Sequence, residues 1–344
     1  MDARNLAAVL AGFVVAVLVL LALTLFVGVD EVVATLQRAD LRLVGVVALS
    51  ILLWNVLWGF SLQVVVSAVG DEISTWNAVL VHAGAAFANH VTPFGQAGGE
   101  PITAWLLSDV SEAPFERSMA AVTSFDVINL IPSLTLATLG LAYYSVVTAL
   151  GSTLQQLAVG VLVLVFVLPA VGLTLWRHRE TTHTVLVRVL TPVARGVGRL
   201  LPGVSAPNRA DVAERIDRFA DGVGSVATDR RRVTAAVGFS TGGWLLQAVG
   251  LWVALQAVGA TVPPYVPLFV VPLGALAGAL PTPGGLGGIE AIQVGLLTAT
   301  TAVVDAKITA AVLVFSVGGF LLTTSIGAAA ATVIKLRRDE PTAV

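Results

Sequence analysis

The sequence is poor in charge and contains no cysteine. Only 12% of its 344 residues are Asp, Glu, Lys or Arg, whereas a soluble domain carries about 25%. The lack of cysteine excludes disulfides, thiolate nucleophiles and Cys-ligated zinc or iron–sulfur sites. A net charge of −2 argues against a nucleic-acid-binding surface, so no nucleic-acid partner is expected. Only four histidines are present, and we expect neither a metal site nor a cofactor.

Apolar residues, by contrast, are abundant and occur in long runs. They make up 56% of the chain, and the mean hydropathy is +0.91. Runs longer than about 18 apolar residues predict membrane-spanning helices. The first run lacks a small-residue cleavage site, which favours a retained helix over a signal peptide. Six full spans are predicted, at residues 6–28, 41–69, 117–148, 154–177, 233–259 and 306–335.

Two further apolar segments are interrupted. The first, residues 76–108, is broken at 89–100, and the second, residues 267–301, is broken at 281–290. Each break contains proline and several glycines, which cost about 3 and about 1 kcal/mol in a helix interior. Neither break is therefore expected to be ordinary helix, and each segment is predicted to fold as a broken-helix hairpin.

The distribution of arginine predicts the orientation. Residues 177–232 hold more than half of the basic residues, and a short basic run lies at 335–338. The positive-inside rule places the 178–232 linker and both termini in the cytoplasm, with the chain in the plasma membrane. Counting spans then makes the first hairpin re-entrant from the cytoplasmic side and the second re-entrant from the outer side. The linker itself reads as two amphipathic helices, the second capped by Asn208.

The two breaks resemble each other. Residues 92–107 align without a gap on residues 282–297, and half of the aligned positions are identical. Paired, interrupted segments in two inverted halves indicate a transporter-type site. We therefore predict an all-α polytopic membrane protein with six full spans and two re-entrant hairpins in an inverted repeat, eight helical membrane segments in all. Residues 1–344 form one integral-membrane domain, with repeat halves at 29–150 and 233–335.

The hairpin tips are the predicted binding site. Non-helical backbone at membrane depth must line a cavity, and a half-helix beginning near Gly99 or Gly288 presents free N–H groups to a phosphate or carboxylate. Pro101 suits a first-turn position of such a helix. The candidate headgroup-binding residues are Asn89, Thr92, Pro93, Gly95, Gly98, Gly99, Glu100, Thr282, Pro283, Gly285, Gly287, Gly288 and Glu290.

Intramembrane acids are costly and are usually functional. Glu100, Glu290 and Asp126, with His90, are candidates for proton or ion coupling. Alternatively, each glutamate satisfies N–H groups in the first turn of its own half-helix. No nucleophile is grouped with histidine and aspartate, so no catalytic residue is assigned and an enzyme is not expected.

At these residues the chain resembles a known family. The element from Asn89 through Gly98-Gly99-Glu100-Pro101, followed by residues 281–290, is similar to the lysylphosphatidylglycerol synthase transmembrane-region family of flippase-like proteins. The preference of the whole chain for arginine over lysine suggests an archaeal member of this family. The resemblance implies lipid translocation, with membrane lipids as substrate and lipid-modifying enzymes as candidate partners. Family members often carry arginines where this chain has Thr103 and Thr123. The chain has no room for an aminoacyl-transferase domain, so synthase activity is not expected.

Three functions remain open at this point. The leading hypothesis is a flippase-like protein that moves a polar-headgroup lipid, either a phospholipid or a lipid-linked sugar, through a cavity between the hairpins. An ion-coupled small-solute transporter is the first alternative, and an intramembrane lipid-phosphate enzyme is the second. A cavity that opens sideways to lipid favours the first function over the second.

Overall fold

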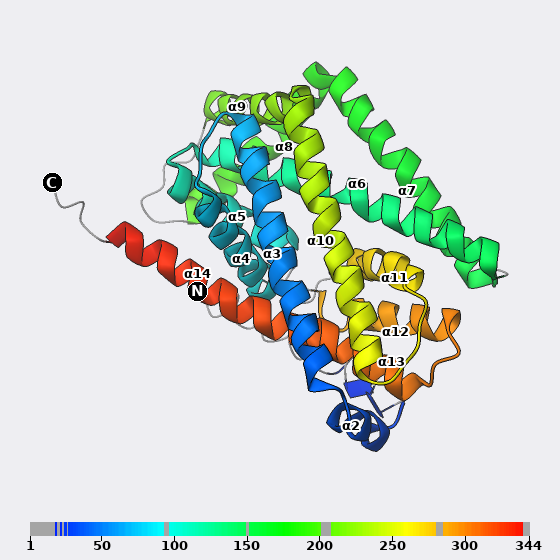
Figure 1. Cartoon of the computed structure of the whole chain (residues 1–344). Coiled ribbons are helices and arrows are strands. Elements are labelled where there is room, and N and C mark those ends of the chain that lie inside the picture. The colour runs from blue at the N-terminus through cyan, green and yellow to red at the C-terminus, as the bar shows by residue number, and fades with distance from the viewer. Residues whose placement is uncertain are drawn as a thin grey trace.

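The computed structural model describes residues 18, 21–22, 24–25, 27–92, 96–148, 151–200, 208–279 and 285–339. Across these ranges the regular secondary structure is entirely helical (Figure 1), which confirms the predicted all-α class. In chain order the elements are α2 (Val29–Gln37), α3 (Leu41–Val69), α4 (Thr75–Val91), α5 (Gln96–Ser111), α6 (Phe115–Val147), α7 (Ser152–Arg177), α8 (Arg179–Leu200), α9 (Arg209–Thr228), α10 (Arg230–Ala257), α11 (Tyr265–Ala275), η1 (Leu276–Ala279), α12 (Gly288–Thr300), α13 (Asp305–Val312), the π-helical turn η3 (Leu313–Val317) and α14 (Gly318–Asp339).

Helices long and apolar enough to cross a membrane account for five of the six predicted full spans. The first predicted span, residues 6–28, lies largely outside the described residues. The final span is composite, because α13, η3 and α14 continue one another. The chain is thus a multi-pass membrane protein. The five spans are Leu41–Val69, Phe115–Val147, Leu154–Arg177, Arg230–Ala257 and Asp305–Ile334.

Helices α3 and α10 run antiparallel through the bundle (Figure 1). At one end, the backbone N–H of Asp40, the N-cap of α3, donates to the carbonyl of Ala257 at 2.9 Å. Further along, Ser61 Oγ donates to the carbonyl of Ala236 at 3.0 Å. We call the end with the Asp40 contact the α2 end and the opposite one the α9 end.

The first hairpin, α4 and α5, enters and leaves the bundle at the α9 end. Helix α3 finishes there with Gly70, whose φ of 99° is the left-handed conformation that glycine adopts without strain. Helix α4 begins a few residues later, and α5 leads into α6. Arg117 of α6 pairs with Asp71 at 3.0 Å, so both ends of the hairpin lie together.

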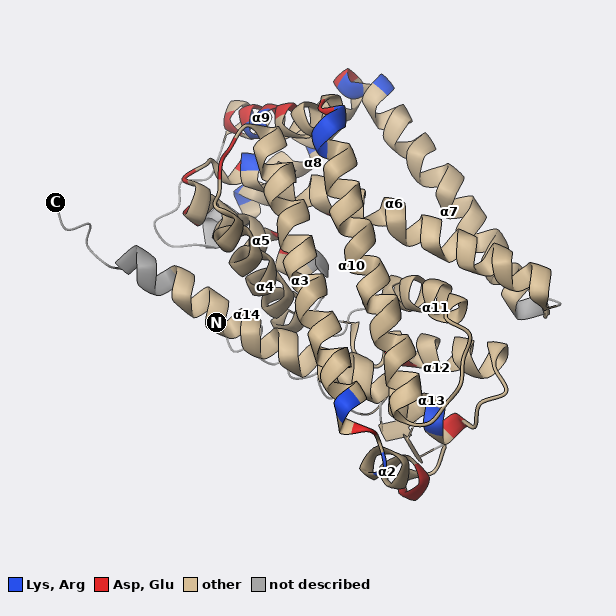
Figure 2. Cartoon of the chain, viewed as in Figure 1, with Lys and Arg blue, Asp and Glu red and all other residues tan. Residues whose placement is uncertain are grey.

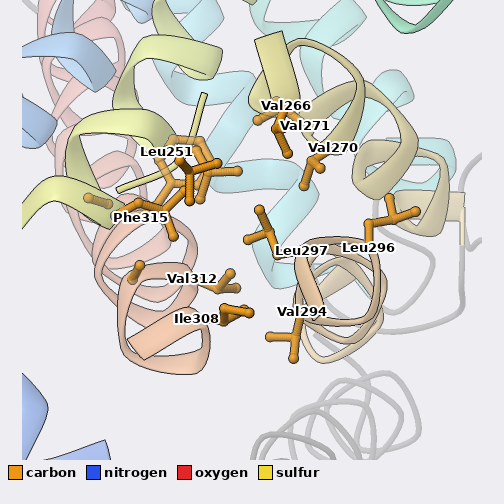
Figure 3. Close-up of a cluster of buried hydrophobic side chains, with 14 of the residues drawn as sticks. Leu251, Val266, Val270, Val271, Val294, Leu296, Leu297, Ile308, Val312 and Phe315 are labelled. Atoms are coloured by element: carbon orange, nitrogen blue, oxygen red, sulfur yellow. The ribbon is translucent and has the colours of Figure 1, made fainter. Parts of the chain in front are cut away.

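The second hairpin, α11 with η1 and α12, enters and leaves at the α2 end. It follows α10 and leads into α13, where Lys307 Nζ donates to the carbonyl of Gly259 at 2.8 Å. Buried side chains of α10 to α13 and η3, among them Leu251, Val270 and Leu297, hold it in place (Figure 3). The two hairpins therefore approach the centre from opposite ends, while the division into repeat halves at 29–150 and 233–335 stays a prediction.

The first break is shorter than predicted. Helix α4 continues through Val91 and α5 already begins at Gln96, so Pro101 lies inside α5 and not in its first turn. The reason is packing: Gly99 lies against Asn89 of α4, where a Cβ would collide with backbone atoms. Glycine in this stretch permits close helix contact and does not end the helix. The prediction that residues 89–100 are non-helical is wrong for residues 89–91 and 96–100, and residues 93–95 lie outside the described residues. In the second segment α12 begins at Gly288, as expected.

Charged residues gather at the two ends of the bundle, and its middle is nearly free of them (Figure 2). At the α9 end lie α8 and α9, the two helices predicted for the linker. Asn208 caps α9 with a capping box. Glu116 of α6 contacts Arg215 and Arg218 of α9 at 3.0 and 3.6 Å, which fixes α9 to the end of the bundle.

Candidate functional site

The two hairpins and helices α3, α6 and α10 enclose a cavity of about 520 Å³. Residues of both hairpins line it, from α4 and α5 on one side and from α11, η1 and α12 on the other. The polar lining residues are His82, Asn89, His90, Glu100, Thr103, Thr123, Asp126, Asn129, Ser133 and Gln247.

A pair of carboxyl groups forms part of the cavity wall. Glu100 projects from α5 and Asp126 from α6, and the two carboxyl groups lie close enough to interact directly. Both residues were candidate coupling residues, but their pairing across two helices was not predicted.

The same cavity also has an aromatic wall. The rings of Trp54 and Trp58 lie 5.3 Å apart, those of Trp58 and Trp244 5.4 Å, and those of Trp58 and His82 5.7 Å. All four side chains line the cavity. Such rings offer flat apolar surface together with ring N–H donors.

A hydrogen-bond cluster fixes the wall to α6 and α10. Ser240 Oγ donates to Asn129 Oδ1 in a short hydrogen bond. Trp244 Nε1 donates to the carbonyl of Asn129 at 3.1 Å, and Trp58 Nε1 donates to the carbonyl of Ser240 at 3.2 Å. Two indole rings and one buried amide therefore hold one another in place across α3, α6 and α10.

Several buried polar atoms of residues that line the cavity have no protein partner. They are Trp54 Nε1, His82 Nε2, Asn89 Oδ1 and Gln247 Nε2. Buried polar groups are normally hydrogen-bonded, so these atoms need water or a polar ligand. Both donors and acceptors are thus available to a bound group.

The rim of the cavity is apolar and open. Val127, Leu130 and Leu276 line it, although 57%, 38% and 41% of their respective surfaces are exposed. Val127 and Leu130 belong to α6, a membrane span. A cavity with a polar interior thus opens on the apolar flank of the bundle.

Glu290 lies in a second, smaller cavity of about 140 Å³. Only 1% of its surface is exposed. Its Oε2 accepts from the backbone N–H of Gly287 at 2.5 Å, and its Oε1 accepts a short hydrogen bond from Ser316 Oγ. Glu290 therefore caps its own helix, whereas Glu100 contacts Asp126. The two cavities adjoin, because Trp54, His90 and three other residues line both.

The other predicted site residues fall into four groups. Asn89 and His90 line the large cavity, and His90 Nδ1 also contacts Thr324 Oγ1 at 2.6 Å. Thr92, Gly98 and Gly99 form the α4–α5 contact. Gly285 and Gly287, with φ of 73° and 85°, form the turn before Gly288. Pro93, Gly95, Thr282 and Pro283 lie outside the described residues.

Thr103 and Thr123, where the family resemblance leads one to expect arginine, both line the large cavity. Thr103 Oγ1 donates to the carbonyl of Gly99 at 3.0 Å, so the hydrogen of this hydroxyl is used within its own helix. Among the described residues that line this cavity there is no lysine or arginine. A negatively charged ligand would not find a cationic side chain there.

These features define a polytopic α-helical membrane protein with a cavity between two opposed helical hairpins. The chain matches the lysylphosphatidylglycerol synthase TM region family over residues 9–327, and it belongs to this family. A relative from the archaeon Methanothermobacter thermautotrophicus, described as a UPF0104 membrane protein, is 31% identical over 292 residues, covering 83% of this chain and 80% of the relative. A second UPF0104 membrane protein from the same organism is 23% identical over 286 residues, covering 82% of each chain.

Proposed function

We propose that this protein moves a polar-headgroup lipid, either a phospholipid or a lipid-linked sugar, across the plasma membrane. The headgroup occupies the cavity of about 520 Å³, while the tail stays in the bilayer outside the rim. The protein acts as a transporter and not as an enzyme. Membrane lipids are its substrate, and lipid-modifying enzymes are the partners that would supply or consume them.

The observation that carries this proposal is the sideways opening of a polar cavity. Val127, Leu130 and Leu276 form an apolar rim, while the Glu100–Asp126 pair and unpartnered N–H groups lie inside. A free solute needs only an aqueous entrance, whereas a lipid needs a polar interior that is continuous with hydrocarbon. This favours a lipid over the alternative, an ion-coupled small-solute transporter.

The lengths of the hairpin helices support a site near the bilayer midplane. Helix α12 has 13 residues and is about 20 Å long, shorter than the hydrocarbon core of about 30 Å. We therefore interpret both hairpins as re-entrant, one from each side, as in inverted-repeat transporters. The arginine-rich α9 end then faces the cytoplasm, together with both termini.

The lining predicts which parts of a headgroup are recognised. Hydroxyl or ammonium groups would donate to the Glu100–Asp126 pair, and the indole rings would cover an apolar or cationic face.

Translocation in proteoliposomes tests the proposal. Headgroup-accessible fluorescent phospholipids and a lipid-linked sugar would be followed with a membrane-impermeant quencher. Glu100→Gln and Asp126→Asn should each slow translocation about tenfold, which corresponds to one lost hydrogen bond of about 1.4 kcal/mol. Glu214→Gln, at an exposed acid of α9, is the control. If Glu100→Gln and Glu290→Gln both leave the rate unchanged, these carboxylates are only structural.

A second pair of variants tests the rim. Val127→Trp should obstruct the opening and slow translocation. Val146→Trp, on the same helix but 83% exposed and outside the cavity lining, should not. Equal rates for the two variants would contradict the lateral route. Uptake of a water-soluble solute without lipid movement would favour the alternative transporter.

A further inference from the structure

We propose that the small cavity beside α12 binds a desolvated monovalent alkali cation, held by Glu290 Oε1, Gln293 Oε1 and Ser316 Oγ. The large cavity would hold the transported headgroup, whereas this site is separate from it and holds only the ion. Ion binding here does not depend on the proposed lipid transport and can be measured without it.

The first observation is a buried acid without a cationic side chain. Glu290 is 1% exposed, and no lysine or arginine is among the described residues that line its cavity. His90, the other titratable residue of the lining, stacks on Phe320 with ring centres 4.0 Å apart and contacts Thr324. An unpaired buried carboxylate is costly. A bound cation would supply the missing charge.

The second observation is an unpartnered oxygen beside that acid. Gln293 follows Glu290 by three residues on α12, so both project from one face of the helix. It is 2% exposed, lines the same cavity, and its Oε1 has no hydrogen-bond partner. Gly274 of α11 leaves room for the side chain, because a Cβ there would lie 2.7 Å from Gln293 Cγ. A buried amide oxygen held in this way is a ready cation ligand.

The third observation is the irregular helix opposite. Ser316 lies within the π-helical turn η3 and donates to Glu290, which leaves its oxygen lone pairs free to coordinate. Single π-helical turns are frequent at functional sites. Coupling ions in transporters are commonly held where a half-helix meets irregular backbone, which is the arrangement of α12 and η3.

The three proposed oxygen ligands fit a monovalent alkali ion better than they fit other classes of metal ion. All three are oxygens, which excludes metals that prefer nitrogen or sulfur. One carboxylate balances one positive charge, whereas calcium sites use several carboxylates. In the described part of the chain, no group of three or more His, Cys, Asp or Glu residues is arranged so that it could hold a metal ion. The cavity volume of about 140 Å³ leaves room for the ion with one or two waters, and the adjoining large cavity offers a hydrated route.

Thermal unfolding of the detergent-purified chain gives the first test, read from its seven tryptophans. NaCl or KCl should raise the unfolding temperature in a saturable way over choline chloride at equal ionic strength, because choline is too large for the site. Glu290→Gln should lose this difference. Glu100→Gln, which changes the aligned glutamate of the other hairpin, should keep it. Equal unfolding temperatures in all three salts would overturn the proposal.

Direct binding of radioactive sodium, with potassium as competitor, gives the second test. Ser316→Ala should weaken binding roughly 10- to 100-fold, and Gln293→Leu should do the same without leaving a void. Ser325→Ala, which removes a hydroxyl from the exposed face of α14, should bind like the unchanged protein. These milder variants keep the test valid if Glu290→Gln fails to fold. Unchanged binding in both would show that the ion binds elsewhere and would overturn the proposal.

Discussion

Gly99 provides a direct test of how closely the two helices of the first hairpin pack. A Cβ at this position would lie 2.8 Å from the backbone N of Asn89 and 2.9 Å from its Cα, well inside the ordinary contact range of 3.4–4 Å. Backbone atoms cannot rotate away, so in Gly99→Ala the start of α5 must move off α4. Overpacking of this kind costs about 1–3 kcal/mol.

The same substitution also raises helix propensity, and this gain in stability must be separated from the cost of the clash. Alanine stabilises a helix by about 1 kcal/mol over glycine. Gly295→Ala on α12 is the matched control, because its Cβ would meet nothing within 4 Å. Both variants gain the same helix propensity. The difference between their unfolding free energies therefore measures the cost of the clash at Gly99. We expect Gly99→Ala to be less stable than Gly295→Ala by about 1–3 kcal/mol.

Thermal unfolding in detergent measures the difference, and translocation in proteoliposomes shows its effect on the site. Because Asn89 lines the large cavity, Gly99→Ala should also slow translocation, whereas Gly295→Ala should not. If both variants shift the unfolding temperature equally, α4 and α5 do not approach at Gly99 and the packing argument is refuted.

Two further variants test the cavity wall and the start of α10. Ser240→Ala removes the donor to Asn129 Oδ1 and should cost about 1–3 kcal/mol of unfolding free energy; a threonine at this position, which keeps the hydroxyl, should restore most of it. At Asp229, the backbone N–H of Arg232 donates at 3.0 Å and holds the pKa of that carboxyl below its usual range. Its stabilisation is therefore present above the unfolded pKa of about 3.9 and lost as pH falls through the lower folded value. Hydrogen exchange in the first turn of α10, corrected for intrinsic rates, should accelerate below about pH 4, and Asp229→Ala should abolish this step.

Much of the fold could be predicted because its signals are local. Long apolar runs predict α3, α6, α7, α10 and the final span, since in hydrocarbon a helix must satisfy its own backbone. The capping box at Asn208 also follows from neighbouring residues. By contrast, the boundaries of the first hairpin depend on the fit of Gly99 against Asn89. Local propensity cannot distinguish a glycine that ends a helix from one that lets two helices touch.

The site was only partly predictable for the same reason. The rarity of intramembrane acids singles out Glu100, Asp126 and Glu290, but it cannot show which of them meet. Asp126 comes to Glu100 only through the packing of α5 on α6. The aromatic wall was missed, because Trp54, Trp58 and Trp244 belong to spans in which tryptophan is unremarkable as a sequence signal. Their ring N–H groups become informative only when their partners, or the lack of them, are known.

Glu100 and Glu290 occupy aligned positions in the two hairpins, yet their surroundings differ. Glu290 is buried, caps its own helix and contacts a π-helical turn. Glu100 is half-buried and contacts a second acid in the larger cavity. A repeated motif thus supplies two different chemical environments, one beside a second acid in a large cavity and one buried beside a smaller cavity. Because His90 and Trp54 line both cavities, a ligand in one would alter contacts shared with the other. If the proposed ion and headgroup both bind, their affinities should therefore be linked reciprocally.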